Sequence, residues 1–418
     1  MVAAQPRSTF VLDNGAYNIK AGFAINSFPS IIPNCVARGR DRKVYIADQL
    51  TSQCKDYSGV AFRRPFEKAH LVNWESESVI WDRVFSSDDV GFRVVPDETA
   101  LIATEPVLHL PSCSSNMDQM VFEEYGFSTY YRSTASALAH ENDTEMLYGG
   151  LAGQRSDTSL VIDLGYSATT IVPIIADTVY RPAIRRLDVG GRLLRNVLKE
   201  TVSFRHYNMM DESATINDIK DQVCYVSLSF SKDLEMCKKL SFAKNPLAVN
   251  YVLPLQSTSG SRLGHVLNKS EAPEPDDQIL TLGNERFSVP ELLFMPSDID
   301  MRQAGLPEAI MQAVSAVPDP DIRNLLLGNV IVTGGTSQFP GFKERLSAEL
   351  QTMIPTDATL RIGFPENPIA YAWEGGAKLG QQKSRLRLLQ VTRKEYLEYG
   401  SNLCMQKFGK QSIDIFSG

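Results

Sequence analysis

The sequence predicts an α/β protein with two related lobes, and three observations carry that prediction. The chain has 418 residues, more than the roughly 250–300 that one hydrophobic core usually serves. The string Phe10–Gly15 returns about 150 residues later as Leu160–Gly165, and both copies read as a strand ending in Asp-x-Gly, a turn and a second strand. Val330–Val332 is typical of a buried strand, and Gly334-Gly335 and a helical pattern follow it.

Each predicted hairpin opens a lobe. The first strand ends in Asn14-Gly15, a strong short-range turn signal, and Ala21–Phe23 begins the return strand. In the second copy Thr169–Pro173 is the return strand. Chance similarity between two short strings is the alternative, and it would leave an α/β chain without an internal duplication.

Elsewhere, apolar residues recur every three or four positions, which places them on one face of a helix. The pattern predicts helices over 73–85, 117–124, 133–140, 216–230, 342–353 and 379–399, and a strand over 101–106. The predicted helix over 379–399 carries basic residues among its leucines. A basic helix face of this kind is usually exposed to solvent without a binding role. The basic cluster at 38–43 lies in a polar stretch, where solvation and a contact role stay equally open.

Composition argues against several classes of function. The formal net charge of −7 disfavours a bulk electrostatic grip on nucleic acid, although local basic patches remain. The six cysteines are scattered without a C-x-x-C pair, so we expect reduced thiols and neither a disulfide framework nor a zinc site. We also expect no secretory signal and no membrane span, because no apolar run reaches the required length.

The turns after the predicted strands fit a nucleotide site. Backbone N–H groups of a hairpin turn form a concave nest for phosphate oxygens, and a helix N-terminus adds more. Asp13 and Asp163 could hold the water shell of a Mg²⁺ ion that bridges the phosphates, and Lys20 would add a positive charge. Gly334–Thr336 would lie against the adenosine. For an isolated Gly-Gly turn, a tight connection without any ligand is the alternative.

Eight ordered segments convert this pattern into a family resemblance. They are DNGAYNIKAGF, FPSII, VNWESESVIW, ATEPVL, FEEYGF, DIKDQVCYVSLSF, ELLFMPS and VTGGTSQFPGF. Together they cover nearly the whole chain and resemble actin and the actin-related proteins. The two hairpins and the Gly-Gly turn alone are shared with sugar kinases and Hsp70-type chaperones. The resemblance implies an actin-like two-lobed fold, each lobe a ribonuclease-H-like core with a smaller inserted subdomain, and ATP in the cleft.

The resemblance also implies domain boundaries and site residues. The first lobe comprises 1–144 and 372–418 with an outer subdomain at 33–69, and the second comprises 145–371 with an outer subdomain at about 190–300 and an exposed insert near 257–278. The implied nucleotide-binding residues are Asp13, Asn14, Gly15, Ala16, Tyr17, Lys20, Asp163, Gly165, Gly191, Lys220, Asp221, Gly334, Gly335 and Thr336. No dedicated metal ligand is expected.

Both phosphate turns depart from the family pattern. Gly15-Ala16-Tyr17 stands where the family has Gly-Ser-Gly, so a hydroxyl is lost and a bulky ring replaces a glycine. Asp163-Leu164-Gly165-Tyr166-Ser167 stands where the family has Asp-x-Gly-Asp-Gly, so the second carboxylate and glycine are gone. On the base side Lys220 and Asp221 match the family, whereas Asn217 and Ile369 replace an arginine and a lysine.

The positions that orient the attacking water also change. By the family pattern Ala135 replaces a glutamine and Thr170 replaces a histidine. In-line attack on a γ-phosphate needs an oriented water, and each positioned group usually contributes about 10²–10⁴-fold. We therefore expect no catalytic residue: ATP or ADP with Mg²⁺ could bind but would not be turned over.

Filament formation is also expected to be lost. The outer loop between Ser30 and Tyr45 is shorter than in actin, and it is basic. Where the family has an apolar plug, this chain has Asp298-Ile299-Asp300-Met301, which puts two charges at a place that would have to be buried. A head-to-tail polymer needs a complementary patch at each end, so we expect no homopolymer.

The segments YYRSTASALAH and FRRPFEKAHLVNWE, with the modest length, resemble the sixth, nuclear class of actin-related proteins. That class implies a scaffold subunit of an SWR-type chromatin remodeller, which regulates chromatin and transcription by exchanging conventional histone two-A for its Z variant. The implied partners are an insertion of the remodeller's motor ATPase and a small zinc-finger HIT-type subunit, with the variant histone dimer or nucleosome met indirectly. The alternatives are an actin-like ATPase, weak or active, or a cytoskeletal, cytoplasmic protein, and more remotely a phosphotransferase.

Overall fold

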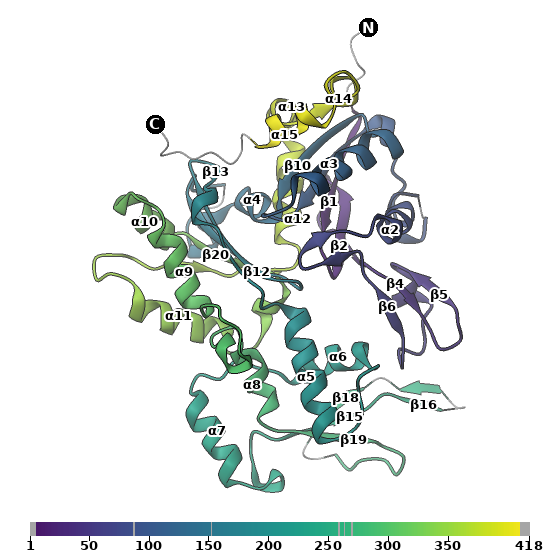
Figure 1. Cartoon of the computed structure of the whole chain (residues 1–418), viewed down its shortest axis with the longest axis vertical. Coiled ribbons are helices and arrows are strands. Elements are labelled where there is room, and N and C mark those ends of the chain that lie inside the picture. Colours follow the sequence, from purple (N-terminus) through teal and green to yellow (C-terminus); the bar gives the residue numbers. More distant parts are fainter. Residues whose placement is uncertain are drawn as a thin grey trace.

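Two sheets organise the fold (Figure 1). The computed structural model describes residues 6–86, 88–151, 153–257, 260–262, 264–268 and 271–409. Within these ranges the first sheet has six strands in the order β22 (Val391–Thr392), β10 (Thr129–Thr134), β9 (Thr99–Glu105), β1 (Ser8–Asn14), β2 (Asn18–Phe23) and β3 (Ser30–Pro33). The second has β13 (Thr178–Val179), β12 (Thr169–Ile175), β11 (Ser159–Leu164), β20 (Val330–Thr333) and β21 (Ile362–Gly363) in that order, with β14 (Arg185–Leu187) also paired to β12.

The two sheets repeat one local topology. In the first, β1 pairs antiparallel with β2 and parallel with β9. In the second, β11 pairs antiparallel with β12 and parallel with β20. Both predicted hairpins are therefore present, and each is flanked by a parallel strand whose carboxyl end lies at the same edge of the sheet. Asp13 pairs with Lys20 in one register and Asp163 with Thr170 in the other, so equivalent positions face the same way.

Helices α4 (Ala135–His140) and α12 (Tyr371–Gln381) lie between the two sheets (Figure 1). Leu138 and Trp373 pack into the core of the first sheet. Ala139 and Tyr371 pack into a cluster with strands of the second sheet. Each helix thus presents one face to each lobe, and the pair forms the joint between them.

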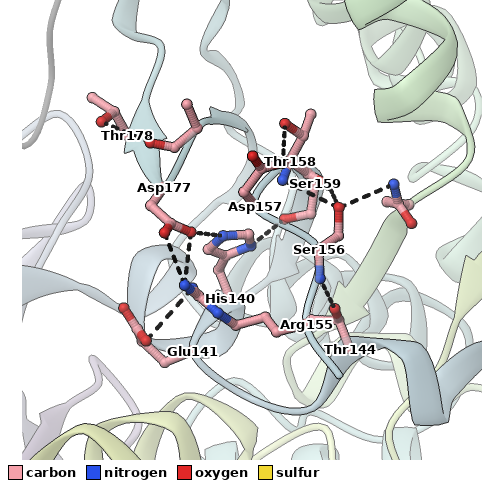
Figure 2. A network of polar contacts seen from close by, with 12 residues as sticks. His140, Glu141, Thr144, Arg155, Ser156, Asp157, Thr158, Ser159, Asp177 and Thr178 are labelled. Atoms are coloured by element: carbon pink, nitrogen blue, oxygen red, sulfur yellow. Dashed lines mark hydrogen bonds and ion pairs between the residues drawn. The ribbon is translucent and has the colours of Figure 1, made fainter. Parts of the chain in front are cut away.

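Side-chain hydrogen bonds reinforce this joint (Figure 2). His140, at the end of α4, contacts the Ser159 hydroxyl at 2.7 Å and an Asp177 carboxylate oxygen at 3.1 Å, both on the second lobe. Arg155 bridges Asp177 and Glu141, at 2.9 Å and 3.5 Å. The hydrogen bond to His140, helped by the charge of Arg155, holds the pKa of Asp177 below its usual value although burial opposes this.

Each lobe carries a smaller outer sheet. In the first, β4 (Val36–Arg38), β5 (Val44–Ile46) and β6 (Ala61–Arg63) enclose a small core with α1 (Gln49–Ser52); the two-residue strands β7 (Phe66–Glu67) and β8 (His70–Leu71) follow. In the second, β15 (Val249–Val252), β18 (His265–Leu267) and β19 (Ile279–Leu282) pair beside α5 (Gly191–Arg205), α6 (Ser213–Val223), α7 (Phe230–Lys239) and α8 (Glu285–Glu291).

Much of the predicted insert near 257–278 is solvent-facing. The hairpin of β16 (Leu255–Ser257) and β17 (Gly260–Arg262) leads into it, and residues 271–276 are exposed. Residues 258, 259, 263, 269 and 270 of the insert lie outside the described residues.

The remaining helices cover the sheets. They are α2 (Trp74–Ser86), α3 (Pro111–Gln119) with a π-turn over 120–124, α9 (Leu306–Ser315), α10 (Pro320–Leu327), α11 (Phe342–Met353), α13 (Lys383–Leu389), α14 (Arg393–Tyr399) and α15 (Ser401–Gly409). The predicted helices over 73–85 and 342–353 are confirmed as α2 and α11. Within the described residues, no helix has both the length and the apolar character needed to cross a bilayer.

Two predicted helices were too long. The segment 216–230 leaves the helix after Val223, because the next backbone N–H groups donate to other segments: Tyr225 to Arg286 and Val226 to Pro340. The segment 379–399 is not one helix. It breaks between α12 and α13, and then forms β22 on the edge of the first sheet before α14 begins. Thr392 and Glu395 form a reciprocal capping box that starts α14 afresh.

Gly375 supports the first test of the joint. A Cβ at this position would overlap the main-chain carbonyl of Leu138, so the backbones of α12 and α4 are in direct contact there. Gly375→Ala gains at most about 1 kcal/mol of helix propensity but forces the helices apart, and overpacking of this kind costs about 3 kcal/mol at the upper end of its usual range. We expect a net loss of stability by urea denaturation. Gly409→Ala, which meets no atom within 4 Å, is the matched control and should change little.

Candidate functional site

All fourteen residues predicted to contact nucleotide line one cavity between the lobes. The cavity measures about 380 Å³, within the range typical of small-molecule sites. Its walls come from the β1–β2 turn, the β11–β12 turn, the first residue of α5, the middle of α6 and the Gly-Gly turn after β20. The duplication therefore brings two turns from distant parts of the chain to a single site.

Asp13 is held from two sides. Its Oδ2 forms an ion pair with Lys20 Nζ at 2.8 Å, across the hairpin. Its Oδ1 accepts a hydrogen bond from the Thr104 hydroxyl at 2.9 Å, and that same hydroxyl accepts the Asn14 backbone N–H at 2.8 Å. The sequence prediction missed Thr104. Its position at the end of the predicted strand 101–106 was the available signal, since carboxyl ends of neighbouring parallel strands meet at one edge.

Gly334, in the turn after β20, and Gly15, in the turn after β1, are glycines for different reasons. Gly334 has φ of +90°, which favours glycine, and a Cβ there would also collide with the Leu164 carbonyl. Gly15 is not in the left-handed region. A Cβ there would lie 2.6 Å from the Asn18 carbonyl oxygen, so the constraint is space. The predicted Asn14-Gly15 turn is wrong in detail. Asn14 is the last residue of β1, and residues 15–17 connect it to β2, which begins at Asn18.

Asp163 faces the cavity and is otherwise enclosed by protein. This desolvation raises the pKa of its carboxyl to about 6, against the attraction of Lys20 and with the help of the nearby Asp13 charge. Among the described residues no group of three or more His, Cys, Asp or Glu side chains is placed to hold a metal directly. The two carboxylates therefore fit a Mg²⁺ ion held through its waters and through bound phosphates, which is a common arrangement for this ion.

The two tyrosines that replace turn residues meet across the cleft. The rings of Tyr17, from the first lobe, and Tyr166, from the second, have centroids 4.7 Å apart. The guanidinium of Arg64 lies 4.2 Å from the Tyr17 centroid and 5.3 Å from that of Tyr166. Arg195 donates to the Tyr166 hydroxyl at 2.8 Å. We refer to these four side chains as the aromatic clamp; desolvation and cation–π attraction make such contacts favourable.

The clamp separates two spaces. Tyr17 lines the 380 Å³ cavity and also a second cavity of about 490 Å³, which lies between the two outer subdomains. The outer subdomains touch each other beyond it, where Glu212 accepts from Arg40 at 3.3 Å and from the Gly59 backbone at 3.1 Å. The lobes are thus joined at the joint, at the clamp and at the outer rim, by contacts made within the chain.

The positions expected to orient water line the cavity. Ala135 carries no polar side-chain atom there. Thr170 keeps a hydroxyl whose oxygen is buried and has no hydrogen-bond partner among the described residues. On the base side, Ile369 lies 3.7 Å from where a Cβ at Gly335 would be, and Lys220 contacts Asp221 and lies 5.2 Å from the Phe339 ring centroid. The cavity thus combines polar groups from both hairpins and from α6 with a methyl group at Ala135.

Comparison with known proteins agrees with this geometry. The family model for actin matches residues 4–409. An actin-like protein ARP6 of Yarrowia lipolytica is 41% identical over 97% of this chain and 98% of its own length. An actin-related protein 6 of Neurospora crassa is 40% identical over 97% of this chain and 95% of its own length, and one of Drosophila melanogaster is 36% identical over 93% and 97%.

A double-mutant cycle tests the aromatic clamp. Tyr17→Ala and Tyr166→Ala should each lower stability, and the double variant should lose about 1 kcal/mol less than the sum, because the shared contact is lost only once. Urea denaturation of the four proteins measures this coupling. Pairing Tyr17→Ala with Tyr399→Ala, an exposed ring far along the chain, should be additive. Additivity for Tyr17 and Tyr166 would mean that their contact does not stabilise the closed cleft.

Proposed function

This chain belongs to the actin family, its relatives are named actin-related protein 6, and we propose that it is a non-catalytic scaffold subunit of a nuclear chromatin-remodelling complex. In this proposal the complex is an SWR-type remodeller that exchanges conventional histone two-A for its Z variant. The chain would dock on an insertion of the motor ATPase, beside a zinc-finger HIT-type subunit, and would meet the variant histone dimer or nucleosome only indirectly.

One observation carries the non-catalytic part of the proposal. The fourteen residues predicted to contact nucleotide all line the cavity, whereas Ala135 offers only a methyl group where a water would have to be oriented. Phosphoryl transfer depends almost wholly on positioning and on electrostatic stabilisation. Asp13, Lys20, the turn backbones and Gly334–Thr336 would hold ATP or ADP, with Mg²⁺ between the two carboxylates and the phosphates. A bound Mg²⁺ would neutralise the charge of the phosphates and carboxylates, and the nucleotide would contact both lobes.

A platform role needs a stable closed shape more than it needs turnover. A ligand present at 100 times its Kd stabilises the folded state by ~2.7 kcal/mol through mass action. Here the clamp and the outer rim already connect the lobes through the chain's own side chains. The nucleotide would therefore add to closure that the protein itself supplies.

The surface argues against a homopolymer. Asp298 and Asp300 are both exposed at the position of the expected plug, and burying them against a second copy would strand two charges. The loop at 39–43 is solvent-exposed over most of its length and carries three basic residues. Both ends that a head-to-tail filament would use are polar.

A weak ATPase is the second candidate, and Thr170 favours it. Thr170 lines the cavity and its buried hydroxyl has no partner among the described residues, so a small rotation of the side chain would let it hydrogen-bond a water beside a terminal phosphate. A neutral hydroxyl is a poor general base, so turnover through it alone would be slow. Any residual hydrolysis should then disappear in Thr170→Val, which keeps the shape and removes the hydroxyl.

Turnover and assembly give a direct test. We expect the purified protein to release no phosphate from labelled ATP above the rate of Thr170→Val, and to stay in the supernatant after high-speed centrifugation in Mg²⁺ and salt. The physical reason is the missing water-orienting group and the charged plug. Phosphate release at a rate typical of actin filaments, or pelleting, would reject the scaffold reading.

Gly335→Trp separates nucleotide binding from docking. Gly335 does not need a positive φ, and its Cβ direction meets only Ile369, so a tryptophan can fill the cavity without strain in the turn. We expect loss of retained nucleotide, measured by mass spectrometry of released small molecules, with assembly into the remodeller preserved. Phe204→Trp, at a 92% exposed position outside both cavities, is the size-matched control. Loss of assembly with nucleotide still bound would contradict docking through outer surfaces.

A further inference from the structure

A buried glutamate lies behind the first phosphate turn. Glu77, on α2, is fully buried, and its Oε1 accepts hydrogen bonds from Asn14 Nδ2 at 2.6 Å and from Trp81 Nε1 at 3.0 Å. Asn34, also fully buried, contacts the same carboxyl and donates its amide N–H to the Gly15 carbonyl at 3.0 Å. Glu77 is therefore connected through two amide side chains to the turn that would bind phosphate.

The cluster has more hydrogen-bond acceptors than donors. Glu77 Oε2, Asn14 Oδ1 and Asn34 Oδ1 are all buried and have no partner among the described residues. All three are acceptors if Glu77 is ionised, and buried acceptors without donors are costly. One proton on Glu77 reduces this cost, because Oε2 then donates to one of the two amide oxygens and only the other amide oxygen stays without a donor.

Among the residues that the structure describes, no cation is paired with Glu77. Lys20 pairs with Asp13, on the far side of Asn14. Arg64 donates to the main-chain carbonyls of Tyr17 and Asn34. The remaining titratable group that senses Glu77 is Tyr125, an acid. In the described residues Glu77 has no ion pair, and an isolated buried carboxylate is strongly disfavoured.

We propose that Glu77 is a positioning residue held as a neutral carboxylic acid, whose proton bridges to an amide oxygen and fixes the phosphate turn at Asn14–Tyr17. The proton makes the turn's geometry sensitive to pH. Ionisation would strand a negative charge directly behind the phosphate site. The ligand affected would be a nucleoside di- or triphosphate, so the predicted change in its affinity rests on the proposed function. The assignment of the proton to Glu77 does not rest on it.

Burial raises the pKa of Glu77 to about 7, and the hydrogen bonds from Asn14 and Trp81, with the nearby amide of Asn34, only partly oppose it. The ordinary value is 4.5. Since the folded state holds the proton more tightly than the unfolded state, this proton stabilises the fold fully below pH 4.5, and its contribution is lost as pH rises toward 7. Within that window the unfolding constant should rise about tenfold per pH unit from this group, and it should level off above it.

Glu77→Gln is the decisive variant. A glutamine amide has the same shape as the protonated acid: its oxygen can accept from Asn14 and Trp81, and its N–H₂ can donate where Oε2–H donates. We expect the ratio of the wild-type folding constant to that of Glu77→Gln to fall about tenfold per pH unit between pH 5 and 7, and then to stay level. Glu75→Gln, an exposed neighbour on the same helix, should follow the wild type at every pH. Parallel profiles for the wild type and Glu77→Gln would overturn the proposal.

Two further measurements keep the test sharp. If Glu77→Gln does not fold, infrared spectroscopy of the Asp118→Asn, Asp163→Asn double variant, which removes two other buried acids of raised pKa, should still show a protonated buried carboxyl at pH 6 that ionises near pH 7. Absence of that band would also overturn the assignment. A fluorescent ADP analogue should bind the wild type more weakly as pH rises from 6 to 8, and Glu77→Gln with little change. No ADP binding by either protein would reject the nucleotide site and leave the denaturation test of the proton intact.

Discussion

The direct backbone contact between α4 and α12 is the constraint on which the molecule depends. These two helices are the layer between the sheets, and each contributes apolar side chains to both cores. Gly375 lets the Leu138 carbonyl of α4 contact the backbone of α12. Gly376 and Gly380 let β1 and Ala24 approach the following turns of α12 closely. Because close-packed interiors transmit displacement, the distance between these helices sets the distance between the two phosphate turns. Polar bonds from His140 to Ser159 and Asp177 keep the lobes in that register.

That spacing brings Tyr17 and Tyr166 into contact. Small residues at these places would leave an open channel for phosphates and a hydrated metal, whereas two rings with Arg64 stacked on them connect the lobes directly. The cleft therefore combines the remnants of a nucleotide site with contacts that hold it closed. The exposed charges at Asp298 and Asp300 complete the picture by disfavouring self-association.

Buried polar groups behind the turns add a second level of control. Thr104 fixes Asp13 and Asn14 from the neighbouring parallel strand. Glu77 and Asn34 fix Asn14 and Gly15 from the other side. Such a network is stabilising only when each donor meets an acceptor, which is why the protonation state of one carboxyl matters to the whole turn. The same reasoning applies to Asp163, whose pKa is raised mainly by burial, with a smaller contribution from the nearby charge of Asp13.

The sequence by itself determined the fold class, the two hairpins, the strand–Gly-Gly–helix unit and fourteen of the residues that line the cleft, because these features are encoded in local period, in turn glycines and in a motif order that spans the chain. It could not locate Thr104, Arg64 or Glu77 in the site, since their contacts join segments far apart in the chain. It also extended two helices too far, because the residues after Val223 and Leu389 follow a helical pattern but donate their hydrogen bonds to neighbouring strands and loops. Only the tertiary structure decided that the two substituted tyrosines touch, because ring contact depends on the relative position of two lobes, which no local pattern specifies.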